Sequence, residues 1–298
     1  MAVGRLVGLA SQATLATSSS ATVTIPDDGS VAEGDLLIVG CVMPSGSRTF
    51  AISGGAGTWN SLGSAAQSGH TSQVWWRIAT EGDLGTTVTV TPSTGNIRQV
   101  LLLASISGVD QDTPIAASQG ATTLNPAKVT PVIEDVPADC RDVSVVWDSR
   151  GASTPNTSSW TPPLGVTRVL QAFTTDGSGA SSGAMGDSDS TVTEIAGGRE
   201  WTPDQPAIGS AWTLVIAPGA EPGQTITPER IESTATVYTP TLVPGPVTLT
   251  PARIEPTTTV YTPTLVTAGI LTPARIESTA TVYTPTLEIG RASCRERV

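Results

Sequence analysis

The chain has 298 residues, with 26 acidic and 15 basic side chains and a formal net charge of −11. Its 30 glycines follow no three-residue period, which excludes a collagen, and no apolar run approaches the roughly 18 residues of a membrane-spanning helix. The acidic balance and the one lysine, Lys128, argue against a nucleic-acid-binding protein, which would carry clustered lysine and arginine. The hydrophobic content of 38% is sufficient for the core of a domain of roughly 200 residues.

The first ten residues predict a β-strand and not a secretory leader. The apolar stretch after Arg5 stops at Ser11, which is shorter than the apolar region that a signal peptide needs. We therefore expect no signal peptide.

Residues 1–218 predict a β-sandwich or jelly-roll-like domain that is almost free of helix. No segment keeps a 3.6-residue apolar period, whereas many short segments rich in threonine and valine are separated by glycine, serine, proline and aspartate. The expected strands are 3–9, 21–25, 35–43, 72–79, 86–91, 99–107, 141–148, 167–173, 180–186 and 211–217.

Alternation within the strand at 72–79 predicts which side chains point inward. Val74, Trp76 and Ile78 share one face, while Gln73 and Trp75 lie on the other. Trp76 is therefore expected in the core and Trp75 on the outer face.

The domain shows signs of an internal duplication. Asp35 precedes one apolar run and Asp142 precedes another, 107 positions later, while Trp59 and Trp160 are related by an offset of 101. Two similar β units packed face to face are one interpretation of this pattern. The other is ordinary turn chemistry, because aspartate and proline commonly precede strands.

Several of these segments resemble one known kind of module. Gly34-Asp35-Leu36-Leu37, the run from Val74 to Thr80, and Ser107-Gly108-Val109-Asp110 followed by Pro114 are similar to a β-sandwich module of phage tail and surface proteins. The resemblance covers about residues 20–218. It implies a structural or adhesive module without known catalytic residues.

Residues 226–287 form a tandem array. The units start at Ile226, Leu249 and Leu271 and share the pattern TPxRIExTxTVYTPTL. Stacked units or three wound chains would bury the repeated isoleucine, valine and tyrosine, whereas the prolines favour an extended linker without a fixed fold. The array, with its preceding residues from 219 onward, is expected to be a shaft or stalk that assembles a homotrimer.

Residues 288–298 break this composition abruptly. One possible back-translation of the segment from Glu288 to Val298 resembles a short-read sequencing adapter read in frame. We interpret it as a non-biological tail.

The sequence offers few groups for catalysis or for a cofactor. The one histidine, His70, lies in a polar segment and is expected to be solvated, and neither a nucleophile elbow nor a phosphate-binding loop occurs. Cys41 and Cys140 are expected to be buried free thiols. We expect no enzyme activity and no cofactor.

Two acidic pairs are candidates for a calcium site. Asp187 and Asp189 form one pair, and Asp110 and Asp112 form the other. Carboxylates at this spacing are suitable ligands for Ca²⁺. The alternative is that they cap turns by accepting hydrogen bonds from nearby amides.

Three tryptophans are candidates for stacking against sugar rings. They are Trp75 on the polar face of its strand, and Trp160 and Trp201 in Trp-Thr-Pro turns. Alternatively, these rings fold back and close the ends of the sandwich, because an indole buries a large area.

The resemblance and the array together imply a structural virion protein of a phage tail or fibre, assembled in the host cytoplasm. Its expected partners are other tail proteins and a host cell-surface glycan. The alternative is a bacterial surface carbohydrate-binding module on a Thr/Pro-rich stalk. A third hypothesis, a glycan-cleaving enzyme with paired carboxylates, has no particular residues in its favour.

Overall fold

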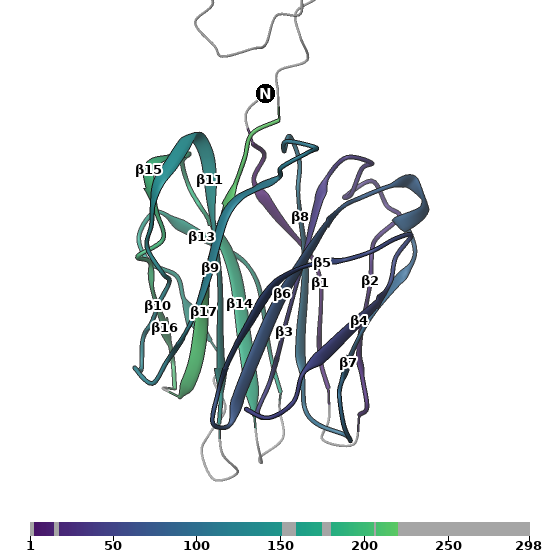
Figure 1. Ribbon diagram of the computed structural model, residues 1–298, viewed down its shortest axis with the longest axis vertical. Coiled ribbons are helices and arrows are strands. Elements are labelled where there is room, and N and C mark those ends of the chain that lie inside the picture. The colour runs from purple at the N-terminus through teal and green to yellow at the C-terminus, as the bar shows by residue number, and fades with distance from the viewer. Residues whose placement is uncertain (1–2, 15–17, 151–158, 175–179, 206, 220–298) are drawn as a thin grey trace, which may run out of the picture. The chain divides into compact units, whose positions relative to one another are not determined.

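The computed structural model describes residues 3–14, 18–150, 159–174, 180–205 and 207–219 (Figure 1). The tandem array and the segment 288–298 lie outside these residues, so the hypotheses about them stay predictions. No helix in the described ranges is long and apolar enough to cross a membrane.

The first half of the described chain folds into two antiparallel sheets. One sheet has the order β1-β8-β3-β6-β5, and the other has the order β2-β7-β4. The one helical element among the described residues is a 3-10 turn, η1, at Glu81–Asp83. We call this half the first roll, with the strands β1 (Leu6–Ala13), β2 (Ala21–Thr24), β3 (Leu36–Met43), β4 (Phe50–Gly54), β5 (Asn60–Gln67), β6 (His70–Ile78), β7 (Thr87–Pro92) and β8 (Val100–Ile106).

The second half repeats this topology. Its main sheet has the order β9-β17-β11-β14-β13 and its outer sheet the order β10-β16-β12, while β15 pairs with β11. We call this half the second roll, with the strands β9 (Ile115–Thr123), β10 (Lys128–Val129), β11 (Ile133–Ser149), β12 (Trp160–Thr161), β13 (Val166–Phe173), β14 (Ser181–Ser188), β15 (Val192–Ala196), β16 (Glu200–Pro203) and β17 (Ile208–Ile216).

The strand orders confirm the predicted duplication. The strands of the second roll are counted here without the extra β15. In both rolls the first strand then pairs with the last, and the third strand pairs with the last and with the sixth. The registers agree as well, since Leu36 lies opposite Ile106 in the first roll and Val143 lies opposite Leu214 in the second. Leu36 and Val143 are 107 positions apart, the same offset as the two aspartates before them. Each roll is a jelly-roll-like sandwich.

The tryptophan offset does not reflect the same equivalence. Trp59 lies between β4 and β5, whereas Trp160 begins β12. All ten expected strands overlap strands of the structure. Of the strands that the sequence did not predict, β5 (NSLGSAAQ) and β9 (IAASQGATT) consist mostly of small and polar residues. The others, β4, β10, β12, β15 and β16, have two to five residues each.

The two rolls share one core between their main sheets. Leu36 and Ile38 of the first roll pack there with Val143, Val145 and the other members of one continuous cluster. A second cluster lies between the main and outer sheets of the first roll, and smaller clusters cover the other face of the second roll. The central strands of both main sheets are therefore buried on both faces, as the continuous apolar runs of β3 and β8 require.

This layering overturns the expected orientation of the tryptophans in β6. Trp75 is only 3% exposed and packs in the core of the first roll, while Trp76 is half-buried at the edge of the shared core. The prediction of an outer position for Trp75 was wrong because the outer sheet β2-β7-β4 covers that face.

The shared interface combines large side chains with small ones at equivalent positions. By register, Gly40 of the first roll corresponds to Trp147 of the second, and Val74 corresponds to Gly183. A Cβ atom on Gly40 would lie 2.5 Å from the indole of Trp147, and one on Gly183 would lie 2.0 Å from it. The Trp147 ring therefore fills the space left by two glycines, one from each roll.

Candidate functional site

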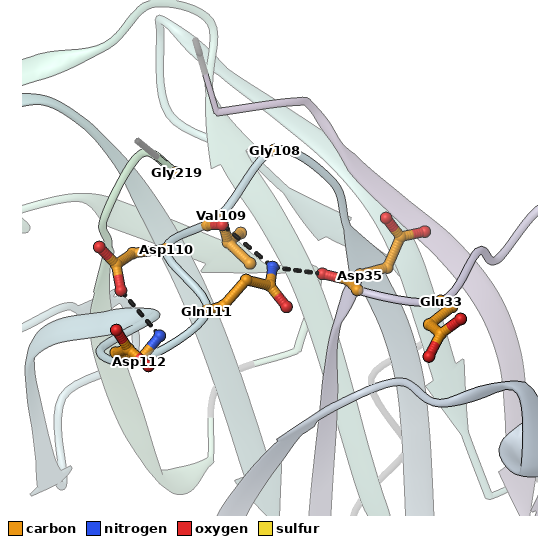
Figure 2. Close-up of a pocket in the computed structure, with 9 residues that line it drawn as sticks. Glu33, Asp35, Gly108, Val109, Asp110, Gln111, Asp112 and Gly219 are labelled. Carbon is orange, nitrogen blue, oxygen red and sulfur yellow. Dashed lines mark hydrogen bonds between the residues drawn. The ribbon is translucent and has the colours of Figure 1, made fainter. Parts of the chain in front are cut away.

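A hollow of about 500 Å³ opens where the described chain ends. Its walls are the connection before β3, the turn after β8 and the last described residue, Gly219 (Figure 2). It carries the carboxylates of Glu33, Asp35, Asp110 and Asp112. None of the described residues that line this acidic hollow is basic.

Hydrogen bonds organise both walls of the acidic hollow. The Oδ1 atom of Asp110 accepts the amides of Asp112 at 2.9 Å and Thr113 at 2.7 Å, and these bonds lower the pKa of Asp110. The Nε2 atom of Gln111 donates across the hollow to the carbonyl oxygen of Gly34 at 2.9 Å. Asp110 thus caps a turn, which was the alternative to calcium binding for this pair.

The acidic hollow favours cationic or hydrogen-bond-donating groups over anions. Among the described residues, no group of three histidine, cysteine, aspartate or glutamate side chains is arranged to hold a metal ion. Glu33, Asp35 and Gln111 were not identified from the sequence, because only the fold brings the connection before β3 beside the turn after β8.

The second acidic pair forms a clamp between the two rolls instead of a calcium site. Asp187 is fully buried and accepts the Nε atom of Arg5 at 2.7 Å, the amide of Leu6 at 3.2 Å and the Nη1 atom of Arg141 at 3.4 Å. These three bonds end on Oδ2, and Oδ1 accepts Nη2 of Arg5 at 3.0 Å. Both oxygens are thus occupied by donors, which come from both rolls. These contacts do not support the calcium interpretation of Asp187, because arginines supply the positive charge.

Asp189 lies at the exposed rim of the same clamp. It accepts Nη2 of Arg5 at 3.1 Å and the hydroxyl of Thr167 at 2.6 Å, and the Thr167 bond lowers the pKa of Asp189. It supports Arg5 and has no metal-ligating partner among the described residues.

The three candidate sugar-stacking tryptophans are all buried. Trp75 is 3% exposed, Trp160 is 1% exposed and Trp201 is fully enclosed. Trp160 donates its Nε1–H to Ser182 at 3.0 Å, and both Trp160 and Trp201 pack between the sheets of the second roll. The prediction of exposed stacking faces was wrong, because the outer sheet of the first roll covers Trp75, whereas Trp160 and Trp201 point from the outer sheet of the second roll onto its main sheet.

The sequence had led us to expect a solvated His70. In the structure this side chain is buried between the rolls. Its ring nitrogens lie 2.8 Å from the hydroxyls of Ser149 and Ser210, and Ser72 lies 2.6 Å from Ser210. Burial, with the positive charge of Lys128, lowers the pKa of His70 to about 3. With no exposed surface, this histidine–serine cluster is a structural contact and not a site for substrate.

Lys128 of the second roll is also buried, and its positive charge acts on His70. Its Nζ atom donates to the carbonyl oxygens of Asn125 and Ala207 at 2.6 Å and of Pro126 at 3.2 Å. Burial lowers the pKa of Lys128 to about 8, against the opposing effect of Asp148. The lysine therefore ties two connections of the second roll together.

The fold and these contacts define an all-β protein in which two equivalent jelly-roll-like units share one core. Comparison of the chain with protein families, curated proteins and solved structures finds no match.

Proposed function

We propose that the chain is a non-enzymatic structural protein of a phage tail or tail fibre that contributes to host-surface attachment. The observation that carries this proposal is the continuous core shared by the two rolls. Such a core makes the pair one stiff block, because close-packed interiors transmit strain and do not deform continuously. A stiff block followed by a tandem array suits a component that bears load.

The clamps between the rolls support the same role. Asp187 joins Arg5 of the first roll to Arg141 of the second, and His70 bridges two serines of the second roll. Asp187, Arg141, His70 and its two serines are buried, whereas Arg5 is partly exposed, so most of these hydrogen bonds are shielded from competing water. The resemblance of residues 20–218 to a tail and surface module is the reason for choosing a virion over other structural settings.

The solution mass tests the proposal most directly. Light scattering of residues 1–287, with and without residues 219–287, distinguishes an assembling shaft from a linker. We expect a trimer for the longer chain and a monomer for the shorter one, with electron micrographs of the trimer showing a rod attached to compact heads. Monomers in both cases would contradict the proposal of an assembling fibre.

A further inference from the structure

The contacts between the two rolls are reciprocal. The first strand of the first roll, β1, packs against β13, the fifth strand of the second roll, and the first strand of the second roll, β9, packs against β5, the fifth strand of the first. The last and sixth strands behave in the same way, since β8 packs against β14 and β17 packs against β6. This reciprocity is the property of an interface about a two-fold axis, so a pseudo-two-fold axis relates the two rolls.

The pseudo-two-fold axis runs between β3 and β11. These strands are the third of each roll, and they pack against each other. Their side chains enter the shared core as equivalent pairs 107 positions apart, Leu36 with Val143 and Ile38 with Val145. A strand that packs against its own equivalent lies beside the axis, because every other strand is carried to a different place by the rotation.

Gly40 and Trp147 are one of these equivalent pairs, and they meet directly. A Cβ atom on Gly40 would lie 2.5 Å from the Trp147 indole. The indole also covers Gly183, its partner in the β11–β14 ladder, and the position equivalent to Gly183 is Val74, the ladder partner of Gly40. At the axis, one roll thus presents glycine beside valine where the other presents tryptophan beside glycine.

This complementarity excludes the pairing of two identical rolls. Two copies of the second roll would place one Trp147 indole against another at the axis, and two copies of the first would place Gly40 against Gly40 with no side chain to fill the space. The first arrangement is overpacked and the second leaves a cavity, and both cost stability. The two faces therefore fit each other better than either fits itself.

We propose that the inner face of each main sheet is a former homodimer interface, and that the partner it fits is a roll of the same fold presented about a two-fold axis. In a homodimer the same patch lies on both subunits, which is the origin of the reciprocal strand contacts and of the equivalent pairs along β3 and β11. Within one chain the two patches could differ, and Gly40 with Val74 now fits Trp147 with Gly183. This inference does not depend on the proposed function.

The test exchanges the two sides of this contact in the full chain. The variant Gly40→Trp with Val74→Gly gives the first roll the pattern of the second. The variant Trp147→Gly with Gly183→Val gives the second roll the pattern of the first. Each variant should lower the unfolding temperature, measured by calorimetry, by about 10 °C, because the first overpacks the axis and the second leaves a cavity there.

The combined variant, with all four substitutions, distinguishes a two-fold relation from two unrelated losses. Under a two-fold relation the exchanged side chains meet in the native arrangement with the rolls reversed, so the combined variant should unfold within about 4 °C of the native chain. Independent losses would instead add to about 20 °C. The remaining difference from the native chain reflects Met185, which lies beside Gly40 and whose equivalent is the larger Trp76.

A matched control removes a tryptophan that does not lie at the axis. Trp201 is fully buried in the second roll, in a cluster outside the shared core. The variant Gly40→Trp with Val74→Gly and Trp201→Gly should therefore show no recovery, and its losses should add.

Two results would overturn the inference. Additive losses in the combined variant would show that the rolls do not meet about a two-fold axis, and recovery in the Trp201 control would show that compensation is not specific to the axis. If either paired variant fails to fold, Gly40→Leu with Trp147→Leu decides the question, because it places the same residue on both sides of the axis as in a homodimer. It should unfold at a higher temperature than Gly40→Leu alone, and a double variant no more stable than this single one would equally reject the inference.

Discussion

The two rolls share a topology but differ in how they hold the connection after their sixth strand. In the first roll the buried carboxylate of Asp83 accepts the amides of Ala56 at 2.7 Å and Thr80 at 2.8 Å, with Arg77 3.0 Å away. Although burial opposes the effect, these donors lower the pKa of Asp83. In the second roll the β11–β15 ladder takes this place. One strand order therefore tolerates two solutions for the same connections.

The rolls also differ at the positions where they meet. By register, Val42 and Leu102 of the first roll correspond to Ser149 and Ser210 of the second, which are the partners of His70. The apolar pattern maintains the fold in both rolls, while the differences make their faces complementary. Experiments that alter one member of an equivalent pair will show how far the two rolls have become dependent on each other.

The largest effect is expected from His70, which the first roll inserts between serines of the second. Its pKa is about 3 in the folded protein, against about 6.5 in an unfolded chain. Between these values the unfolded state binds a proton that the folded state does not. Folding stability should therefore fall by about 4 to 5 kcal/mol as the pH drops from 6.5 to 3, measured by urea unfolding across that range.

The His70→Gln variant isolates this contribution. Carboxylates with lowered pKa, such as Asp83 and Asp110, also weaken the fold in acid, but they do so in both proteins. The difference in stability between the native chain and the variant should therefore shrink as the pH falls. A difference that stays constant would show that His70 does not titrate as its burial requires.

Removal of the Trp147 indole should have the next largest effect. The Trp147→Ala variant leaves a cavity against Gly40 and Gly183, neither of which has a side chain to fill it. We expect a loss of about 4 kcal/mol in the free energy of unfolding, from chemical denaturation. Trp76→Ala, at the half-buried position on the first roll, is the control and should cost clearly less. Equal losses would contradict a special role for the glycine-lined space.

Loss of the Asp187 charge should rank third. Asp187→Asn leaves Arg141 buried without its carboxylate, and removal of one partner of a buried ion pair costs about 3 kcal/mol. Thermal unfolding measures the change. The neighbouring Asp189→Asn variant removes an exposed charge from the same Arg5 and should have little measurable effect, because exposed ion pairs contribute little. A larger loss at Asp189 would contradict the assignment of Asp187 as the clamp.

The sequence predicted the strands that carry long apolar or alternating patterns, and it predicted the duplication through Asp35 and Asp142. It did not predict which polar residues would be enclosed. Local alternation placed Trp75 outside because it cannot reveal a second sheet on that face. His70 and Asp187 look like ordinary surface residues in the sequence, and only contacts with residues 46 or more positions away show their roles.

The acidic hollow illustrates the same limit. Asp110 and Asp112 are visible as a pair, but Glu33 and Asp35 join them only through the pairing of β3 with β8. Sequence spacing identifies groups that are close along the chain. It does not identify groups that a sheet brings together.

The smallest of the predicted effects concerns Lys128, a contact within the second roll. Burial lowers its pKa to about 8, against about 10.4 for an exposed lysine. Between these values the unfolded chain holds a proton that the folded chain lacks, so this group makes folding stability rise with pH. We expect a contribution of about 2 kcal/mol across the window after allowance for solvent screening, measured by urea unfolding.

The Lys128→Met variant keeps the length of the side chain and removes the titration. Burial raises the pKa of Cys41 and of Cys140, so both thiols lower stability above about pH 9, but they do so equally in the native chain and in the variant. The native chain should therefore gain stability relative to the variant between pH 8 and pH 10.5. A relative loss over that window would mean that the three carbonyl oxygens around Nζ outweigh its burial, and Lys128 would then be a net stabilising cation of the second roll.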